Sequence, residues 1–92
     1  MHERALMRDL LAEIEPVARA ERALRVTRVD VRLGALSHFT ADHFREHFAD
    51  ASRGTLAEGA VVHAELDGDV HATRATCVVL ESLEVESMEV ET

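Results

Sequence analysis

The six histidines are the residues of this sequence most able to bind a metal or move a proton. His43 and His47 lie four residues apart, so on a helix both imidazoles would face the same side and could bind one ion. The Glu that follows the first histidine in zinc-enzyme helices is replaced here by Phe44. Phe44 and Phe48 also predict a buried face beside the pair. A solvated or interfacial helix face is therefore the favoured interpretation, with a metal-binding pair as the alternative.

The other isolated candidates carry weaker signals. His38, His63 and His71 have no close partner in the sequence and are expected on the surface. Cys77 is the single cysteine, so it cannot form an internal disulfide or build a zinc site of about four ligands by itself. It lies in an apolar run typical of a strand, where a small buried side chain is expected. A reactive or metal-binding thiol is the alternative.

His2 differs because its position allows several nitrogens to reach one ion. Its imidazole, its own backbone nitrogen and the α-amino group of Met1 could form small chelate rings, and Glu3 adds another backbone nitrogen and a carboxylate. Such a near-planar nitrogen set suits Ni(II) or Cu(II) better than Zn(II) or Mg(II). Taken by itself, however, a histidine at position 2 is more often accidental than functional.

A helix is predicted to carry this N-terminal group. Between Glu3 and about Ala23, apolar residues recur at steps of three and four, which is typical of an amphipathic helix. Pro16 lies inside this pattern and predicts a kink that the helix survives. The first amides of a helix have no intrahelical acceptor, so those of His2 and Glu3 would be free to lose their protons to a metal. The positive helix end would tolerate the resulting charge. The apolar stripe consists of Leu6, Leu10, Ile14, Val17 and Ala18.

A strand and a second helix are expected next. Alternating apolar and charged residues from Arg25 to Gly34 predict a half-buried strand with Val29, Val31 and Leu33 inward. Thr40 is a suitable N-cap for the second helix, and Phe39 could pack on Phe44 as a hydrophobic staple. Gly54 suits the left-handed conformation that follows many helices.

The remaining chain predicts strands. Residues 60–66 place Val62, Ala64 and Leu66 on one face, residues 70–76 suit a short hairpin arm, and a last strand is expected over residues 82–91. A bulge near Glu86 and Ser87 would turn its apolar residues inward. We therefore predict one α+β domain over residues 1–92, with two layers: two helices on one face of a small, three- to four-stranded, mostly antiparallel sheet. The apolar residues of the last strand are Leu83, Val85, Met88 and Val90.

Charge and composition argue against several functional classes. The net charge of -8 would repel phosphate backbones, so nucleic acid is not an expected partner. Neither a membrane-spanning apolar run nor a signal peptide is apparent, which favours a cytoplasmic protein without a membrane partner. We also expect no enzyme, because no nucleophile, paired carboxylates or phosphate loop can be assembled from these residues.

Several motifs taken together resemble those of a known family. They are Met1-His2-Glu3, Arg25 to Val29 with Leu33 to Ser37, Arg53 to Gly59, and Ser87 to Glu91. In this order they resemble HypA/HybF, accessory proteins that help to insert nickel into hydrogenases and, in some organisms, urease. The resemblance covers residues 1 to about 77 and about 80 to 91. It implies that Met1, His2 and Glu3 bind nickel transiently, and that a HypB-like nickel GTPase and a hydrogenase large-subunit precursor are partners.

The sequence also departs from this family in one respect. Family members carry two Cys-x-x-Cys pairs that hold a structural zinc, whereas this chain has the stretch Cys77 to Ser82 with one cysteine. Cys77 corresponds to the first of the four ligands, so we expect the zinc module to be deleted between about residues 77 and 80 and no zinc to bind. The sequence thus predicts a nickel metallochaperone. The alternative is a zinc-free interaction or regulatory module that docks to the hydrogenase maturation machinery without carrying nickel.

Overall fold

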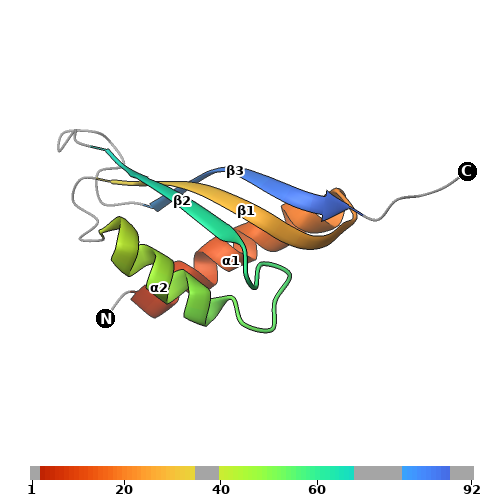
Figure 1. Ribbon diagram of the computed structural model, residues 1–92, viewed down its shortest axis with the longest axis horizontal. Helices are drawn as coiled ribbons and strands as arrows, with labels where there is room; N and C mark the ends of the chain where they lie inside the picture. Colours follow the sequence, from red (N-terminus) through yellow and green to blue (C-terminus); the bar gives the residue numbers. More distant parts are fainter. Residues whose placement is uncertain (1–2, 35–39, 68–77, 88–92) are drawn as a thin grey trace, which may run out of the picture.

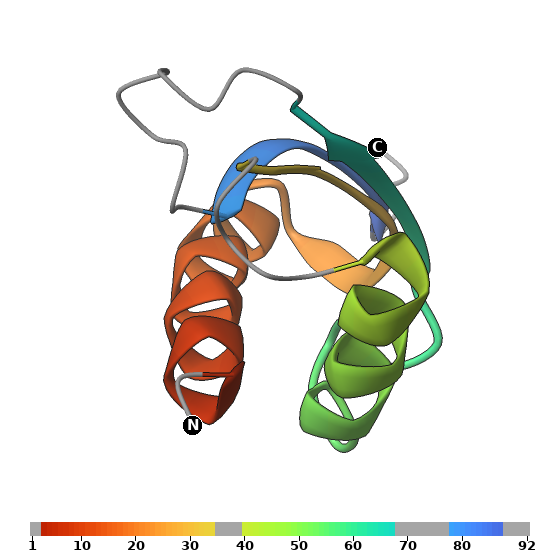
Figure 2. The same ribbon diagram turned by 90° about the vertical axis from the view of Figure 1, so that its left-hand side faces the viewer.

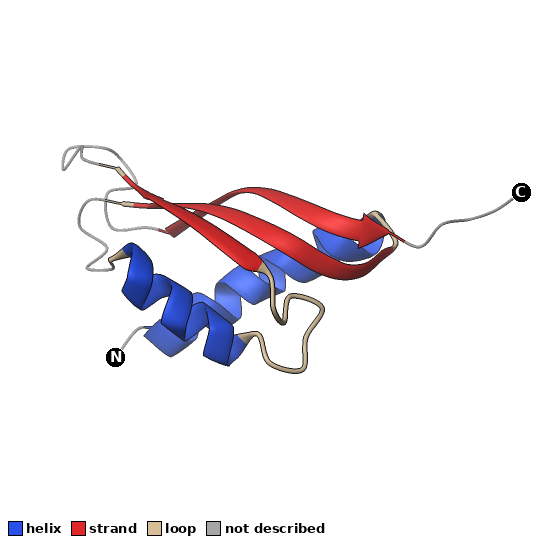
Figure 3. Cartoon of the chain, in the orientation of Figure 1, coloured by secondary structure: helices blue, strands red, loops and turns tan. Residues whose placement is uncertain are grey.

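Two helices cover one face of a three-stranded sheet in the computed structural model (Figure 1). The structure describes residues 3–34, 40–67 and 78–87. Seen end-on, both helices lie on the same side of the curved sheet, which confirms the predicted two-layer α+β fold (Figure 2). In chain order the elements are α1 (Glu3–Ala20), β1 (Ala23–Leu33), α2 (Ala41–Ala51), β2 (Val61–Leu66) and β3 (Val78–Ser87) (Figure 3).

The sheet is mixed, and this corrects the prediction of a mostly antiparallel one. The strand order is β2-β1-β3, with β1 antiparallel to β3 but parallel to β2. The parallel pair has a simple cause, because α2 lies between β1 and β2 in the chain. This helix returns the chain to the end of the sheet at which β1 began, so β2 runs in the same direction as β1. The order of elements was predicted, but the consequence of this crossover for strand direction was missed.

The apolar stripe of α1 packs against the sheet largely as predicted. Leu10, Ile14 and Ala18 are buried, and Met7 joins them. Val17, which was expected on the stripe, is instead 47% exposed. The helix continues through Pro16 to Ala20, so the predicted survival of the helix is confirmed.

The central strand, β1, supplies the middle of the core. Val29, Val31 and Leu33 are buried as predicted, while Val26 is buried although it lies outside their alternation. A register shift explains the exception: Val26 pairs with Val85 and Arg28 with Glu84, so Thr27 is an extra residue on β1. A bulge of this kind changes which face the following side chains occupy.

The start of α2 matches its sequence signal, whereas its end does so only in part, because the C-cap is Ser52 in the right-handed conformation and not Gly54. The Thr40 side chain accepts a hydrogen bond of 3.1 Å from the backbone N–H of His43, as an N-cap does. Phe44 and Phe48 are fully buried, with ring centroids 6.3 Å apart. Gly54, three residues beyond the helix, has φ +77°, the left-handed conformation expected of it. The proposed staple residue Phe39 lies outside the described residues.

The two outer strands differ in detail from prediction. In β2, Val62 is buried and Ala64 half-buried, but Leu66 is 58% exposed and does not join the core. β3 begins at Val78, earlier than expected. A bulge was predicted near Glu86 and Ser87 of this strand, but the extra residue lies on the neighbouring strand. Ala23 of β1 pairs with Ser87 and Arg25 pairs with Glu86, so the unpaired residue between them is Leu24 of β1. The predicted hairpin arm (70–76), Met88 and Val90 lie outside the described residues.

Neither described helix is long and apolar enough to cross a membrane.

Candidate functional site

Of the three predicted nickel ligands, only Glu3 lies among the described residues. Met1 and His2 are outside the described residues, and for Glu3 the structure gives the backbone but not the side chain. Glu3 is the first residue of α1. Its backbone N–H therefore belongs to the first turn of a helix, which has no intrahelical acceptor. This matches the position expected for an amide that could bind a metal.

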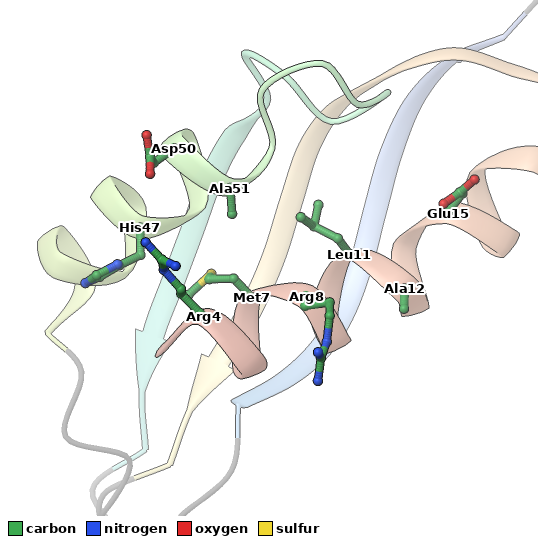
Figure 4. Close-up of a pocket in the computed structure, with 9 residues that line it drawn as sticks. All are labelled: Arg4, Met7, Arg8, Leu11, Ala12, Glu15, His47, Asp50 and Ala51. Carbon is green, nitrogen blue, oxygen red and sulfur yellow. The ribbon is translucent and has the colours of Figure 1, made fainter. Parts of the chain in front are cut away.

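A groove runs between α1 and α2, beside this helix start (Figure 4). Its volume is about 1040 Å³, far more than the coordination sphere of one ion occupies. Buried Met7 gives it an apolar interior, and exposed Arg4 and Arg8 add positive charge from α1. Such a groove suits a large ligand or a segment of protein better than a bare cation. The lining residues are Arg4, Met7, Arg8, Leu11, Ala12 and Glu15 from α1, with His47, Asp50 and Ala51 from α2.

The histidine pair of α2 reaches this groove through His47. The Nε2 atoms of His43 and His47 are 2.9 Å apart, and their ring centroids are separated by 4.5 Å at an interplanar angle of 57°. The predicted common side is therefore confirmed. His43 is exposed and His47 half-buried, in agreement with the solvated or interfacial helix face expected for them. His47 and Arg4, of the first turn of α1, line the same groove.

The remaining metal candidates do not join this pair in the part of the chain that the structure describes. His63 is exposed on β2, with its Nε2 atom 3.7 Å from a carboxylate oxygen of Glu65. His38, His71 and Cys77 are outside the described residues. Within residues 3–34, 40–67 and 78–87, no group of three or more His, Cys, Asp or Glu side chains is arranged to hold an ion.

A polar cluster that the sequence analysis did not single out joins β1 to β3. Asp30 accepts hydrogen bonds from the Arg28 Nε atom at 3.0 Å and from the Ser82 hydroxyl at 2.7 Å. The Ser82 and Arg28 hydrogen bonds hold the pKa of Asp30 below its usual value, and Asp30 raises the pKa of Arg28. The two-residue spacing of Arg28 and Asp30 places them on one strand face and was the available signal. No sequence signal pointed to Ser82, because it is distant from Arg28 and Asp30 in the chain.

The motif from Arg53 to Gly59 forms the loop between α2 and β2. The Glu58 side chain accepts a hydrogen bond of 2.6 Å from the Gly54 N–H, and Gly54 and Gly59 both have positive φ. The Leu56 carbonyl accepts a bond of 2.7 Å from the Val26 N–H, which ties the loop to β1. The motif therefore has a structural role: it shapes the connection that returns the chain to the sheet.

Comparison with known proteins gives a consistent result. Residues 1–81 match the family model described as "Hydrogenase/urease nickel incorporation, metallochaperone, hypA". The hydrogenase maturation factor HypA of Xanthobacter autotrophicus is 41% identical over 69 residues, covering 74% of this chain and 61% of that protein. HypA of Chlorobium limicola is 36% identical over 77 residues, which cover 84% of this chain and 63% of that protein. The chain thus spans less than two thirds of the length of these relatives.

The fold also matches a solved structure. The solution structure of the Ni metallochaperone HypA from Helicobacter pylori superposes with a TM-score of 0.78 at 20% sequence identity, covering 96% of this chain and all of that one. At this identity the likeness concerns the fold, including the mixed three-stranded sheet and its two helices.

Proposed function

Because the chain belongs to the HypA family, we propose that it is a nickel metallochaperone that assists nickel insertion into NiFe hydrogenase, with urease as a possible further target. The observation that carries this proposal is the match of the family model over residues 1–81. That match begins at residue 1, so it includes the Met1-His2-Glu3 start as well as most of the fold. The protein binds and transfers an ion and performs no covalent chemistry.

We place the transient nickel site at Met1, His2 and Glu3. The Met1 amine, the His2 imidazole and backbone nitrogen, and the Glu3 backbone nitrogen together offer a planar nitrogen set, which Ni(II) prefers. The position of Glu3 as the first residue of α1 supports this assignment, because its amide has no intrahelical acceptor. The Glu3 carboxylate would complete or support the set.

The partners follow from the same family membership. We infer that a HypB-like nickel GTPase and the hydrogenase large-subunit precursor exchange nickel with this protein in the cytoplasm. The single cysteine, Cys77, cannot replace the four ligands of a structural zinc site. We therefore propose that nickel is the ion it handles and that it holds no structural zinc.

Nickel titration by calorimetry tests the site. The protein with its native start is compared with His2→Ala and with a variant carrying one additional alanine before Met1. We expect the native protein to bind nickel at the N-terminal site and both variants to bind there at least tenfold more weakly, because each loses an essential nitrogen or its position in the chelate. His63→Ala is the matched control, since it removes an exposed imidazole from β2.

Equal binding by all three proteins would contradict the site. If, in addition, His2→Ala supported hydrogenase maturation as well as the native protein, the chain would be an interaction module that does not carry nickel.

A further inference from the structure

We propose that His43 and His47 form a second metal site, a two-imidazole clasp on α2 for a divalent ion such as Ni(II) or Cu(II). Histidines four residues apart on a helix present both rings to one ion, as in helical zinc sites. Here the rings face each other across 2.9 Å at their Nε2 atoms. The proposal does not depend on the nickel site at Met1-His2-Glu3.

The nitrogen spacing fits particular coordination geometries. Metal to imidazole nitrogen bonds are about 2.0–2.1 Å long, so two nitrogens at right angles around an ion lie about 2.9 Å apart. A tetrahedral angle would separate them by about 3.4 Å. The hydrogen-bonded separation of 2.9 Å is close to the first of these values, so the two nitrogens need to move little relative to each other to take neighbouring positions of a square-planar or octahedral ion. These geometries favour Ni(II) or Cu(II) over Zn(II).

Ion binding needs a change of tautomer in one ring and a rotation of the rings toward a shared ion. At this distance, one Nε2–H of the neutral pair donates a hydrogen bond to the Nε2 lone pair of the other ring. To bind a metal, the donor ring exchanges this proton for one on Nδ1 through water. Once the rings have turned toward the ion, both Nε2 lone pairs can bind it, and no net proton is released.

The helix that carries the pair is firmly attached to the core. Phe44 and Phe48, on the adjacent face of the helix, are fully buried. The Arg45 Nε atom donates a hydrogen bond of 3.0 Å to the Val62 carbonyl of β2. His43 itself lies in the first turn, whose backbone is capped by Thr40. The two imidazoles are thus held on a fixed frame, which reduces the entropy lost on binding.

The surroundings of the pair favour exchange of the ion over permanent storage. His43 is exposed, and His47 lines the groove between the helices. Since the described residues supply no third ligand, the ion would keep positions open for water or for a ligand from another molecule. Asp50 lines the same groove but lies 3.5 Å from the Arg53 guanidinium. Arg4 of the first turn of α1 lines the same groove.

Nickel titration of protein with 15N-labelled histidine rings tests the clasp. We expect the ring signals of His43 and His47 to shift or broaden together, while that of His63 does not follow them. In calorimetry, His47→Ala should lose one binding event, or bind that ion at least tenfold more weakly, while keeping the N-terminal one. His43→Ala should behave alike, and His63→Ala should retain both events.

The variants separate this proposal from the N-terminal site. His2→Ala should retain the clasp, and the double variant His2→Ala/His47→Ala should lose both binding events. Unmoved ring signals of His43 and His47 at nickel saturation, or the same stoichiometry in His47→Ala as in the native protein, would overturn the clasp. Loss in His2→Ala of one binding event, with the His43 and His47 ring signals still shifted by nickel, would support the clasp as a separate site, whereas loss of both events would overturn it.

Discussion

At the scale of single residues, Asp30 shows how a charge on the solvent side of the sheet can join two strands. Its side chain is 19% exposed and accepts hydrogen bonds from Arg28 on its own strand and from Ser82 on β3. Hydrogen bonds to a charged acceptor contribute more than neutral ones, so this cluster should stabilise the β1 and β3 pair.

Replacing Asp30 with asparagine should therefore destabilise the protein in a pH-dependent way. The pKa of Asp30 is lowered in the folded state, so its contribution is present above the unfolded value of about 3.9 and is lost as pH falls through the folded value. At pH 7 we expect Asp30→Asn to lower the free energy of unfolding by about 1 kcal/mol. Urea unfolding at pH 7 and at steps below pH 4 measures both effects.

The control is Ser82→Ala, which removes one of the hydrogen bonds but keeps the ion pair with Arg28. It should cost less than Asp30→Asn at pH 7. The native protein should lose more free energy of unfolding than Asp30→Asn as the pH is lowered below about 4. If both proteins lose the same amount, the stabilising role given to the Asp30 carboxylate is wrong.

At the scale of elements, the sequence predicted features that depend on neighbouring residues. The N-cap Thr40 and left-handed Gly54 were both identified, because their signals are local. The direction of β2 was missed because it depends on how α2 crosses the sheet. Val26 was missed because a bulge depends on pairing with β3, about sixty residues away in the chain.

The cap of α2 gives a prediction at this scale. Thr40→Ala removes the acceptor for the His43 N–H and should lower the free energy of unfolding by about 1 kcal/mol, the usual cost of losing such a cap. Thr40→Ser keeps a hydroxyl in the same place and should stay within about 0.5 kcal/mol of the native protein. Chemical denaturation measures both values. Equal losses for the two variants would show that the methyl group, and not the hydrogen bond, stabilises this helix end.

At the scale of the whole molecule, the question is how 92 residues fold with so few aromatic side chains. The buried core includes Met7 of α1, Val29 of β1, Phe44 of α2 and Val62 of β2, and half-buried residues of β3 pack against it. Each described element thus contributes to one core. The fold class was predictable because apolar periodicity reflects this burial, whereas the groove between α1 and α2 depends on how the helices are placed and had no signal in the sequence.

Such a core predicts that the fold does not require a metal. A structural zinc module folds only when its ligands bind the ion, so removing the metal unfolds it. Here the described elements are held by apolar packing, and no group of three or more metal ligands lies among the described residues. We expect one cooperative thermal transition whose midpoint changes by less than about 2 °C with excess EDTA. Added nickel should raise the midpoint, because an ion that binds the folded state stabilises it.

Elemental analysis completes this test, because the two possible roles of a metal give opposite results. A cargo ion can be removed while the fold persists, so protein stripped of nickel should still unfold in one cooperative transition, at a lower midpoint than the nickel-saturated protein. A structural ion cannot be removed in this way. Stoichiometric zinc in the purified protein, together with a fall in the midpoint of about 10 °C or more in EDTA, would show that the protein holds a structural zinc and that the core described above is not sufficient for folding.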